Sequence, residues 1–271
     1  MDNNNKNIND NKDNKETNKT LIENNIIKTK ETINHHGKFF NCVTREYLNT
    51  SLNHKIHWEC FFRVNTENYK KVYGAEIIGI VNPISKEGKK VLLIENFRYP
   101  IDKKVLEFPS GMIDSHEYKN IKEIYEKIEN TPTTNQKEIL ELNEEYDTKV
   151  KNAIKDGAER ELKEETGYTG TFNKFLNLSN TNSIKVFKNM FHAPWISREN
   201  AAIVMMDIDL ESEANKNPKQ NLEKDELIKP YFVDLDNLLE FITEKVEKED
   251  YGCTSTLYYF AIGMNFSKFV K

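Results

Sequence analysis

The chain has 271 residues, of which 37% are hydrophobic and 11% aromatic, so it can bury the core of one large globular domain or of two modest ones. A formal net charge of −5 argues against a general nucleic-acid binder. Three widely separated cysteines without a Cys-x-x-Cys pair predict neither a disulfide framework nor a zinc site, and no apolar stretch approaches a membrane span of ~18–20 residues. With no apolar signal core at the N-terminus, a cytoplasmic location is the simplest expectation.

The N-terminal segment has the composition of a disordered chain. Residues 1–20 contain eight Asn, four Lys and three Asp, and only Met1 and Ile8 are apolar. Such a segment cannot bury enough apolar surface to offset the entropy of ordering it. We therefore expect a disordered Asn/Lys/Asp-rich tail over 1–31, with order beginning near Thr32.

Apolar runs bounded by turn residues predict a series of strands. They cover 56–64, 75–81, 91–97, 105–108, 201–210 and 230–233. Two amphipathic helices are expected to close the chain, the first after Asp234 and the second capped by Thr254 or Ser255. Strands and helices mix without regular alternation, so the predicted fold class is α+β.

Two helical patterns lie in the middle of the chain, separated by a break at 131–135. The first covers 121–128, and the second runs without a proline over 136–165. Together they predict a helical hairpin, inserted at about 118–152 and exposed as an appendage. Gly157 weakens the second helix by about 1 kcal/mol and is a candidate position for a kink.

The second helical pattern ends in a cluster of acids, 160–167, which reads Arg-Glu-Leu-Lys-Glu-Glu-Thr-Gly. On a helix Glu161 and Glu165 share a face, and Glu164 lies beside them. Arg160 precedes Glu164 by four residues and can hold its carboxylate in place. Because carboxylates this close repel one another, we expect a divalent cation among them, and hard oxygen ligands favour Mg²⁺ or Mn²⁺. A solvated acidic helix face is the alternative.

An upstream segment makes the metal site the better interpretation, because it and the acidic helix together resemble the Nudix box. That family's motif is Gly, five residues, Glu, seven residues, Arg-Glu-apolar-x-Glu-Glu-x-Gly-apolar. Gly111 and Glu117 have the first spacing, and 160–168 matches the second half. The departure is a gap of 42 residues where seven are usual, an excess of 35, which puts the place of Glu117 in doubt. The resemblance implies a Nudix fold, with mixed β-sheets sandwiched between helices.

Within that family the chain is similar to the ADP-ribose pyrophosphatase branch, from about His36 to the C-terminus. The run 106–114 resembles the branch's Glu-Phe-Pro-Ala-Gly-x-Ile-Asp, and 95–100 is similar to its Gln-x-Arg-x-Pro. The branch implies Mg²⁺-dependent hydrolysis, or hydrolysis with Mn²⁺, of the diphosphate of ADP-ribose to AMP and ribose 5-phosphate. At 192–197 an aromatic residue, Trp195, replaces a glycine of the branch, so the alternative is a pocket reshaped for another sugar or nucleoside.

The resemblance also implies a role for individual residues. The metal ligands are the Ser110 carbonyl and the side chains of Glu161 and Glu165, while Glu164 is a further ligand or orients Arg160. Glu226 is the expected catalytic base, with Glu223 and Asp225 as alternatives. The expected substrate contacts are stacking of the adenine by Phe39 and Trp58, Glu59 at the base edge, Arg63 and Arg98 at the diphosphate, and Met112 lining the pocket.

The branch further implies a homodimer. An N-terminal β subdomain, 32–70, is expected to supply dimer contacts and substrate-binding residues, and the hydrolase domain is expected to occupy 71–271. The expected partner is a small nucleoside diphosphate substrate. We expect the protein to bind neither nucleic acid nor a membrane. The alternatives are hydrolysis of a nucleotide sugar, a dinucleotide cofactor or an oxidised nucleoside diphosphate, a non-catalytic nucleotide-binding module, and a protein-interaction role for the hairpin.

Overall fold

The structure, a computed structural model, describes residues 20–23, 25–64, 72–81, 88–118, 120–176 and 190–269. The chain divides into two compact units. The smaller unit contains Met1–Thr66 and Ala193–Arg198, and the larger unit contains Glu67–His192 and Glu199–Lys271. The segment 193–198, expected within the hydrolase domain, therefore belongs to the smaller unit.

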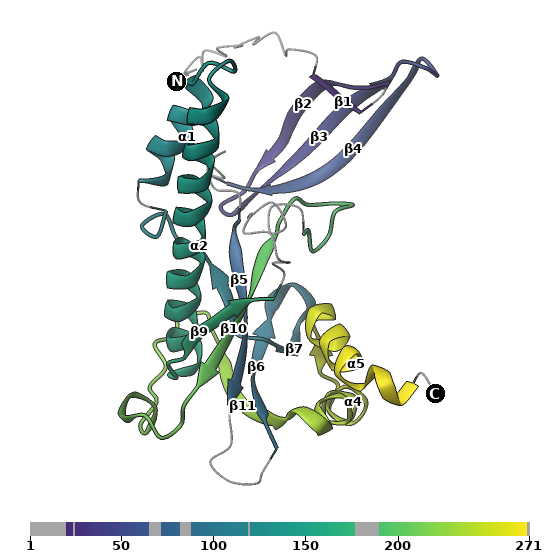
Figure 1. Ribbon diagram of the computed structural model, residues 1–271. Coiled ribbons are helices and arrows are strands. Elements are labelled where there is room, and N and C mark those ends of the chain that lie inside the picture. Colours follow the sequence, from purple (N-terminus) through teal and green to yellow (C-terminus); the bar gives the residue numbers. More distant parts are fainter. Residues whose placement is uncertain are drawn as a thin grey trace, which may run out of the picture. The chain divides into compact units, whose positions relative to one another are not determined.

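The smaller unit is built on an antiparallel sheet with the strand order β1-β2-β3-β4 (Figure 1). Its strands are β1 (Thr20–Glu23), β2 (Ile26–His36), β3 (Phe40–Asn49) and β4 (His54–Arg63). Val43, Cys60 and Phe62 form its buried apolar cluster. The segment 193–198 joins the edge of β4, where the Phe61 N–H donates to the Ile196 carbonyl over 2.9 Å.

The expected boundary of the disordered tail is corrected by β2. Thr32 lies in the middle of this strand, which begins at Ile26, and β1 precedes it. The pattern at 26–36 is too sparsely apolar to predict a strand from its own periodicity. Pairing with β3 supplies the missing support, since Ile27 lies opposite Leu48. The part of the predicted tail over 1–19 lies outside the described residues.

The described residues of the larger unit form an eight-stranded mixed sheet. Its strand order is β12-β7-β6-β5-β10-β9, with β11 also pairing with β6 and β8 with β5. The pairs β10·β5 and β12·β7 are parallel and the others antiparallel. The strands are β5 (Gly74–Val81), β6 (Lys90–Arg98), β7 (Lys103–Glu107), β8 (Ser110–Met112), β9 (Thr171–Phe175), β10 (Ala201–Ile208), β11 (Ile228–Asp234) and β12 (Gly252–Cys253). The expected strands of this unit are confirmed.

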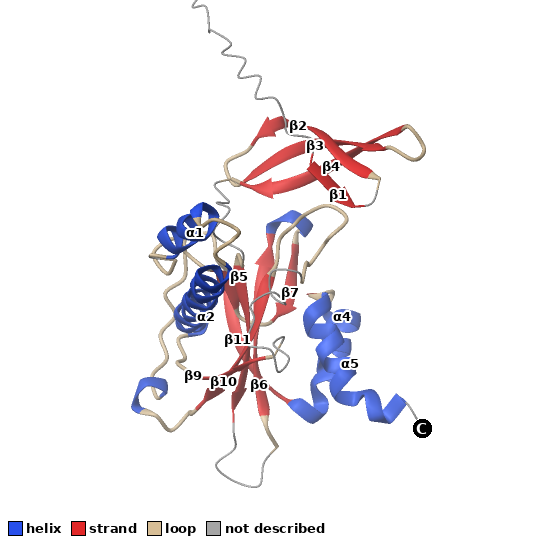
Figure 2. Cartoon of the chain, turned by 45° about the horizontal axis from the view of Figure 1, so that its top comes forward, coloured by secondary structure: helices blue, strands red, loops and turns tan. Residues whose placement is uncertain are grey.

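Helices cover both faces of this sheet (Figure 2). They are α1 (Ile121–Asn130), α2 (Gln136–Thr166), α4 (Leu238–Glu249) and α5 (Ser255–Phe269), with short 3₁₀ turns at Tyr99–Ile101, Glu213–Asn215 and Leu235–Asn237. Successive residues of β5 point to opposite faces, so Ile77 packs in the cluster containing α2 and Ile78 in the cluster containing α4 and α5. The predicted α+β class, with a mixed sheet between helices, is confirmed.

The inserted hairpin is not simply an exposed appendage, as the sequence led us to expect. Ile121 and Ile124 of α1 and Tyr146 and Val150 of α2 are buried in the same cluster as Ile77 of the central sheet. Their amphipathic pattern was visible in the sequence, but the surface that covers it was not. The insertion therefore has an apolar inner face that belongs to the core of the larger unit.

The helix α2 continues for 31 residues through Gly157, without the kink considered above. A Cβ at Gly157 would lie 2.9 Å from Cδ1 of Ile113 and 3.1 Å from Oε2 of Glu117, closer than atoms normally approach. The glycine therefore allows the segment before the insertion to lie directly against the helix after it. This close approach brings the two halves of the interrupted motif together.

We predict that Ile124→Ala lowers the free energy of unfolding by about 2–4 kcal/mol, because it leaves a cavity between α1 and the core. Leu140→Ala is the matched control, since this leucine of the same insertion is 61% exposed, and it should change stability by less than about 0.5 kcal/mol. Urea unfolding measures both values. Equal, small effects would show that the insertion is not packed as described.

Candidate metal and catalytic site

The site begins where β8 crosses the last turns of α2. A Cβ on Gly111 would overlap the carboxyl group of Glu161, so the glycine leaves room for this carboxylate directly against the strand. The Ser110 N–H donates to Oε2 of Glu165 over 2.8 Å. Three predicted metal-binding residues, Ser110, Glu161 and Glu165, are thus brought together from segments 55 residues apart.

Arg160 connects the acids of the two motif segments. Its Nε donates to Oε1 of Glu117 over 2.8 Å, and its Nη1 donates to Glu161 over 2.9 Å and to Glu164 over 2.8 Å. Its Nη2 donates to the Met112 carbonyl over 2.8 Å. The insertion put the position of Glu117 in doubt. In the structure its carboxylate is bonded to Arg160, next to Glu161 and Glu164. The backbone of Met112, which we expected to line the pocket, is held by the same guanidinium.

The carboxylates at this site are short of positive charge. Burial raises the pKa of Glu165 to about 9 against the effect of the Ser110 hydrogen bond, and the charges of Glu161, Glu107 and Glu226 add to the rise. Burial also raises the pKa of Glu161 to about 7, although Arg160 opposes the shift. Both values mean that the ionised forms are poorly stabilised by the protein alone.

The donor set fits a hard divalent cation. Glu161 and Glu165 offer carboxylate oxygens beside the Ser110 backbone, and oxygen ligands are those that Mg²⁺ and Mn²⁺ prefer. Among the described residues no three His, Cys, Asp or Glu side chains already stand together at metal-binding positions. The family resemblance implies that the Ser110 carbonyl would serve beside the two glutamates.

Arg98 is paired differently from what the sequence suggested. It was expected at the substrate diphosphate, yet its Nε and Nη2 donate to Oε2 of Glu107 over 3.2 and 2.9 Å. Glu107 is only 3% exposed, and burial raises its pKa despite Arg98. The sequence predicts no role for Glu107; the available signal is a carboxylate inside the otherwise apolar run 105–108.

Glu226 lies in the loop before β11. Its Oε2 accepts from the Glu223 N–H over 2.8 Å, while its own N–H donates to the Glu223 carbonyl over 3.2 Å. Its charge raises the pKa of Glu165, so the two carboxyl groups interact. The choice of Glu226 as the base, among the three acids considered, stays a prediction.

The other predicted substrate contacts lie in the smaller unit: Phe39, Trp58, Glu59 and Arg63. Within that unit the ring N–H of Trp58 donates to the Trp195 carbonyl over 2.7 Å, and Arg63 lies over the Phe40 ring at 4.8 Å. Phe39 and Glu59 are exposed. The role of these four residues in binding a substrate stays a prediction.

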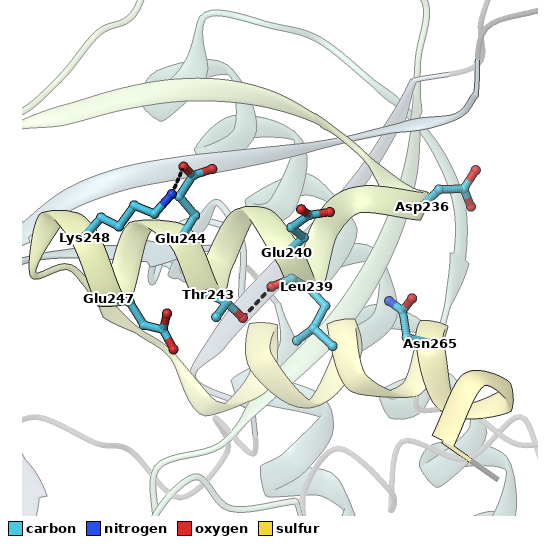
Figure 3. Close-up of a pocket in the computed structure, with 8 residues that line it drawn as sticks. All are labelled: Asp236, Leu239, Glu240, Thr243, Glu244, Glu247, Lys248 and Asn265. Atoms are coloured by element: carbon cyan, nitrogen blue, oxygen red, sulfur yellow. Dashed lines mark hydrogen bonds and ion pairs between the residues drawn. The ribbon is translucent and has the colours of Figure 1, made fainter.

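A separate groove of about 530 Å³ lies along α4 and α5 (Figure 3). It contains none of the predicted site residues. Glu244 is paired with Lys248 over 2.8 Å, and the neighbouring acids Glu240 and Glu247 lie on the exposed face of α4. The groove is therefore explained by a solvated helix surface.

We predict that Glu165→Gln stabilises the protein when no divalent cation is present. A carboxyl group with a folded pKa near 9 and an unfolded pKa near 4.5 costs stability increasingly as pH rises between these values, whereas glutamine stays neutral. The gain should reach about 1–3 kcal/mol at pH 8 and vanish near pH 4.

Thermal and urea unfolding in EDTA across this pH range measures the gain. Glu159→Gln, on the exposed side of the same helix, is the matched control and should show no comparable pH dependence. A Glu165→Gln variant less stable than the wild type at pH 8 would contradict the electrostatic account.

Comparisons with known proteins agree with the motif, although no family model matches the chain. An uncharacterized Nudix hydrolase of Schizosaccharomyces pombe is 29% identical over 208 residues, which cover 77% of each chain. A putative Nudix hydrolase of Caenorhabditis elegans and an ADP-ribose pyrophosphatase of Saccharomyces cerevisiae are each 26% identical, over 194 and 198 residues. These two alignments cover 71% and 72% of the chain but only 66% and 65% of the relatives, so the chain spans about two thirds of their length.

A solved structure of an ADP compounds hydrolase matches with a TM-score of 0.45 and 12% identity, covering 89% of this chain and 94% of that one. The sequence relatives confirm the resemblance to the Nudix hydrolases and to their ADP-ribose pyrophosphatase-like branch. The box residues lie together in the structure, and in sequence the chain is similar to Nudix hydrolases.

Proposed function

We propose that this hydrolase cleaves the diphosphate of ADP-ribose with the help of Mg²⁺, or of Mn²⁺, to give AMP and ribose 5-phosphate. The observation that carries the proposal is the hydrogen-bonded cluster in which Arg160 holds Glu117, Glu161 and Glu164 beside the Ser110–Glu165 contact. It is supported by the run 106–114, which is similar to the ADP-ribose pyrophosphatase branch, and by a relative of that name.

In this proposal Glu161, Glu165 and the Ser110 carbonyl hold the metal. When bound, the cation would supply positive charge beside the diphosphate and would make the attacking water more acidic. Arg160 keeps Glu161 and Glu164 in position. Glu226 accepts the proton of the water whose oxygen attacks one phosphorus, and the bond from that phosphorus to the bridging oxygen breaks.

The remaining roles concern substrate binding. Phe39 and Trp58 stack on the adenine, Glu59 bonds to the base edge, and Arg63 contacts the diphosphate. The side chain of Arg98 is 45% exposed although it pairs with Glu107. We therefore propose that its guanidinium binds the Glu107 carboxylate and the substrate diphosphate at the same time. The homodimer, the small-molecule partner and the cytoplasmic location remain proposals from the family resemblance. No helix among the described residues is long and apolar enough to cross a membrane.

A second candidate is hydrolysis of a different nucleoside diphosphate derivative, such as a nucleotide sugar or a dinucleotide cofactor. The observation that favours it is the loop at 193–198, where Trp195 stands in place of a glycine and its carbonyl holds the ring of Trp58. This contact limits the orientations that the Trp58 ring can adopt. The alternative keeps the same metal chemistry and changes only the group attached to the diphosphate.

A substrate panel separates the two candidates. ADP-ribose, a nucleotide sugar, a dinucleotide cofactor and an oxidised nucleoside diphosphate are each incubated with Mg²⁺ or Mn²⁺, and the products are identified by chromatography and mass spectrometry. We expect the highest kcat/KM with ADP-ribose, and AMP and ribose 5-phosphate as the products. We expect no hydrolysis of ADP-ribose in EDTA. A tenfold preference for another compound would favour the second candidate.

Glu165→Gln should lower metal-dependent kcat by about 10²–10³-fold, because it removes a charged metal ligand. In the wild type Mg²⁺ should raise Tm by binding the folded state, and this rise should be lost in the variant. Glu159→Gln should keep both the activity and the rise in Tm. An unchanged kcat in Glu165→Gln would refute the assignment of this ligand.

A further inference from the structure

The loop before β11 is attached to the C-terminal end of α2. Gly167, with a φ of 78°, ends the helix, and a Cβ there would lie 2.5 Å from the backbone nitrogen of Lys219. Two residues further along this loop, the Asn221 N–H donates to the Glu164 carbonyl over 2.9 Å. The last carbonyls of a helix lack partners within it, so this loop completes their hydrogen bonding.

Gln220 makes the contact that joins both ends of the acidic part of this loop. Its Nε2 donates to the Glu165 carbonyl over 2.5 Å and to the Ile228 carbonyl over 3.1 Å. A side-chain amide nitrogen has two N–H groups, so both bonds can form at once. Gln220 thereby links the end of α2 to the start of β11, and the segment 221–227 forms the loop between these two contacts.

The same segment contains the reciprocal hydrogen bonds between Glu223 and Glu226. Glu165 is consequently engaged twice, with its carbonyl bonded to Gln220 and its carboxylate bonded to the Ser110 N–H. A shift of the loop would change the separation between Glu226 and the carboxylate of Glu165. Gln220 itself is a polar residue in an irregular, exposed loop, which explains why sequence periodicity gave no sign of it.

We propose that Gln220 is a positioning residue of the reaction, which fixes the loop so that Glu226 faces the metal-binding end of α2. The inference rests on the proposed function, because it assigns Glu226 the role of base. It adds that the base is held by the helix that carries the metal ligands. An error of about 1 Å in the position of a reacting group can cost up to about 10²-fold in rate, so one side-chain amide is sufficient to matter.

The test uses Gln220→Met, which keeps the length of the side chain and removes both N–H donors. We expect kcat to fall about tenfold while KM stays within about twofold, because the loop is displaced but Gln220 itself does not touch the substrate. Gln136→Met is the matched control, since it removes an exposed glutamine from the first turn of α2, far from the end of that helix that Gln220 contacts. The control should keep the kcat and KM of the wild type.

A double-mutant cycle separates positioning from general stability. Glu226→Gln alone should lower kcat by about 10²-fold. If Gln220 acts through Glu226, adding Gln220→Met should cause no further loss. Losses that multiply in the double variant would overturn the proposal, because Gln220 would then act independently of the base.

Hydrogen exchange gives a readout that needs no activity. The amides of Asn221 and Glu223, which donate to Glu164 and Glu226, should exchange about tenfold faster in Gln220→Met than in the wild type. Unchanged exchange would overturn the inference, even if the wild type hydrolyses no compound in the panel. A wild type that is active, with a Gln220→Met variant of equal kcat, would overturn the inference and leave the proposed function standing.

Discussion

The guanidinium of Arg160 meets four acceptors that come from distant parts of the chain: the carboxylates of Glu117, Glu161 and Glu164, and the Met112 carbonyl. Burial by itself would lower its pKa, but these hydrogen bonds and charges raise it further above its usual range. A planar group with five N–H donors can serve several carboxylates at once, which a lysine could not do with the same geometry. Strand β8, the segment before the insertion and the box helix are held in one arrangement by this single cation.

Arg160 contacts three of the acids at this site, and Glu165 has a different partner. Glu165 is held by the Ser110 N–H, which has a dipole but no formal charge, and Glu165 lies deeper than the acids that Arg160 contacts. Burial is the main cause of the raised pKa of Glu165, and the charges of Glu161, Glu107 and Glu226 add to it. Arg160 brings one positive charge to three carboxylates, so the acidic cluster as a whole keeps an excess of negative charge.

The amino-acid sequence predicted the parts of this molecule that depend on local patterns or on the motif. The strands β5, β6, β7, β10 and β11 of the larger unit followed from apolar runs, whereas β8, β9 and β12 were not predicted. Ser110, Glu161 and Glu165 lie together, as the motif implied. Strand β2 was missed because its support is non-local, coming from the register with β3. The pairing of Arg98 with Glu107 and the two hydrogen bonds of Gln220 depend on tertiary contacts between polar residues, and such contacts leave no periodic signal.

The uninterrupted helix α2 has a consequence for how the protein can be handled. At 1.5 Å per residue, its first turn at Gln136 lies about 38 Å along the axis from Glu161. The turn at 131–135 between α1 and α2 therefore lies at the far end of a rigid rod from the carboxylates. A fluorophore or an affinity tag attached at that turn would label the protein without contacting the carboxylates at the other end of α2.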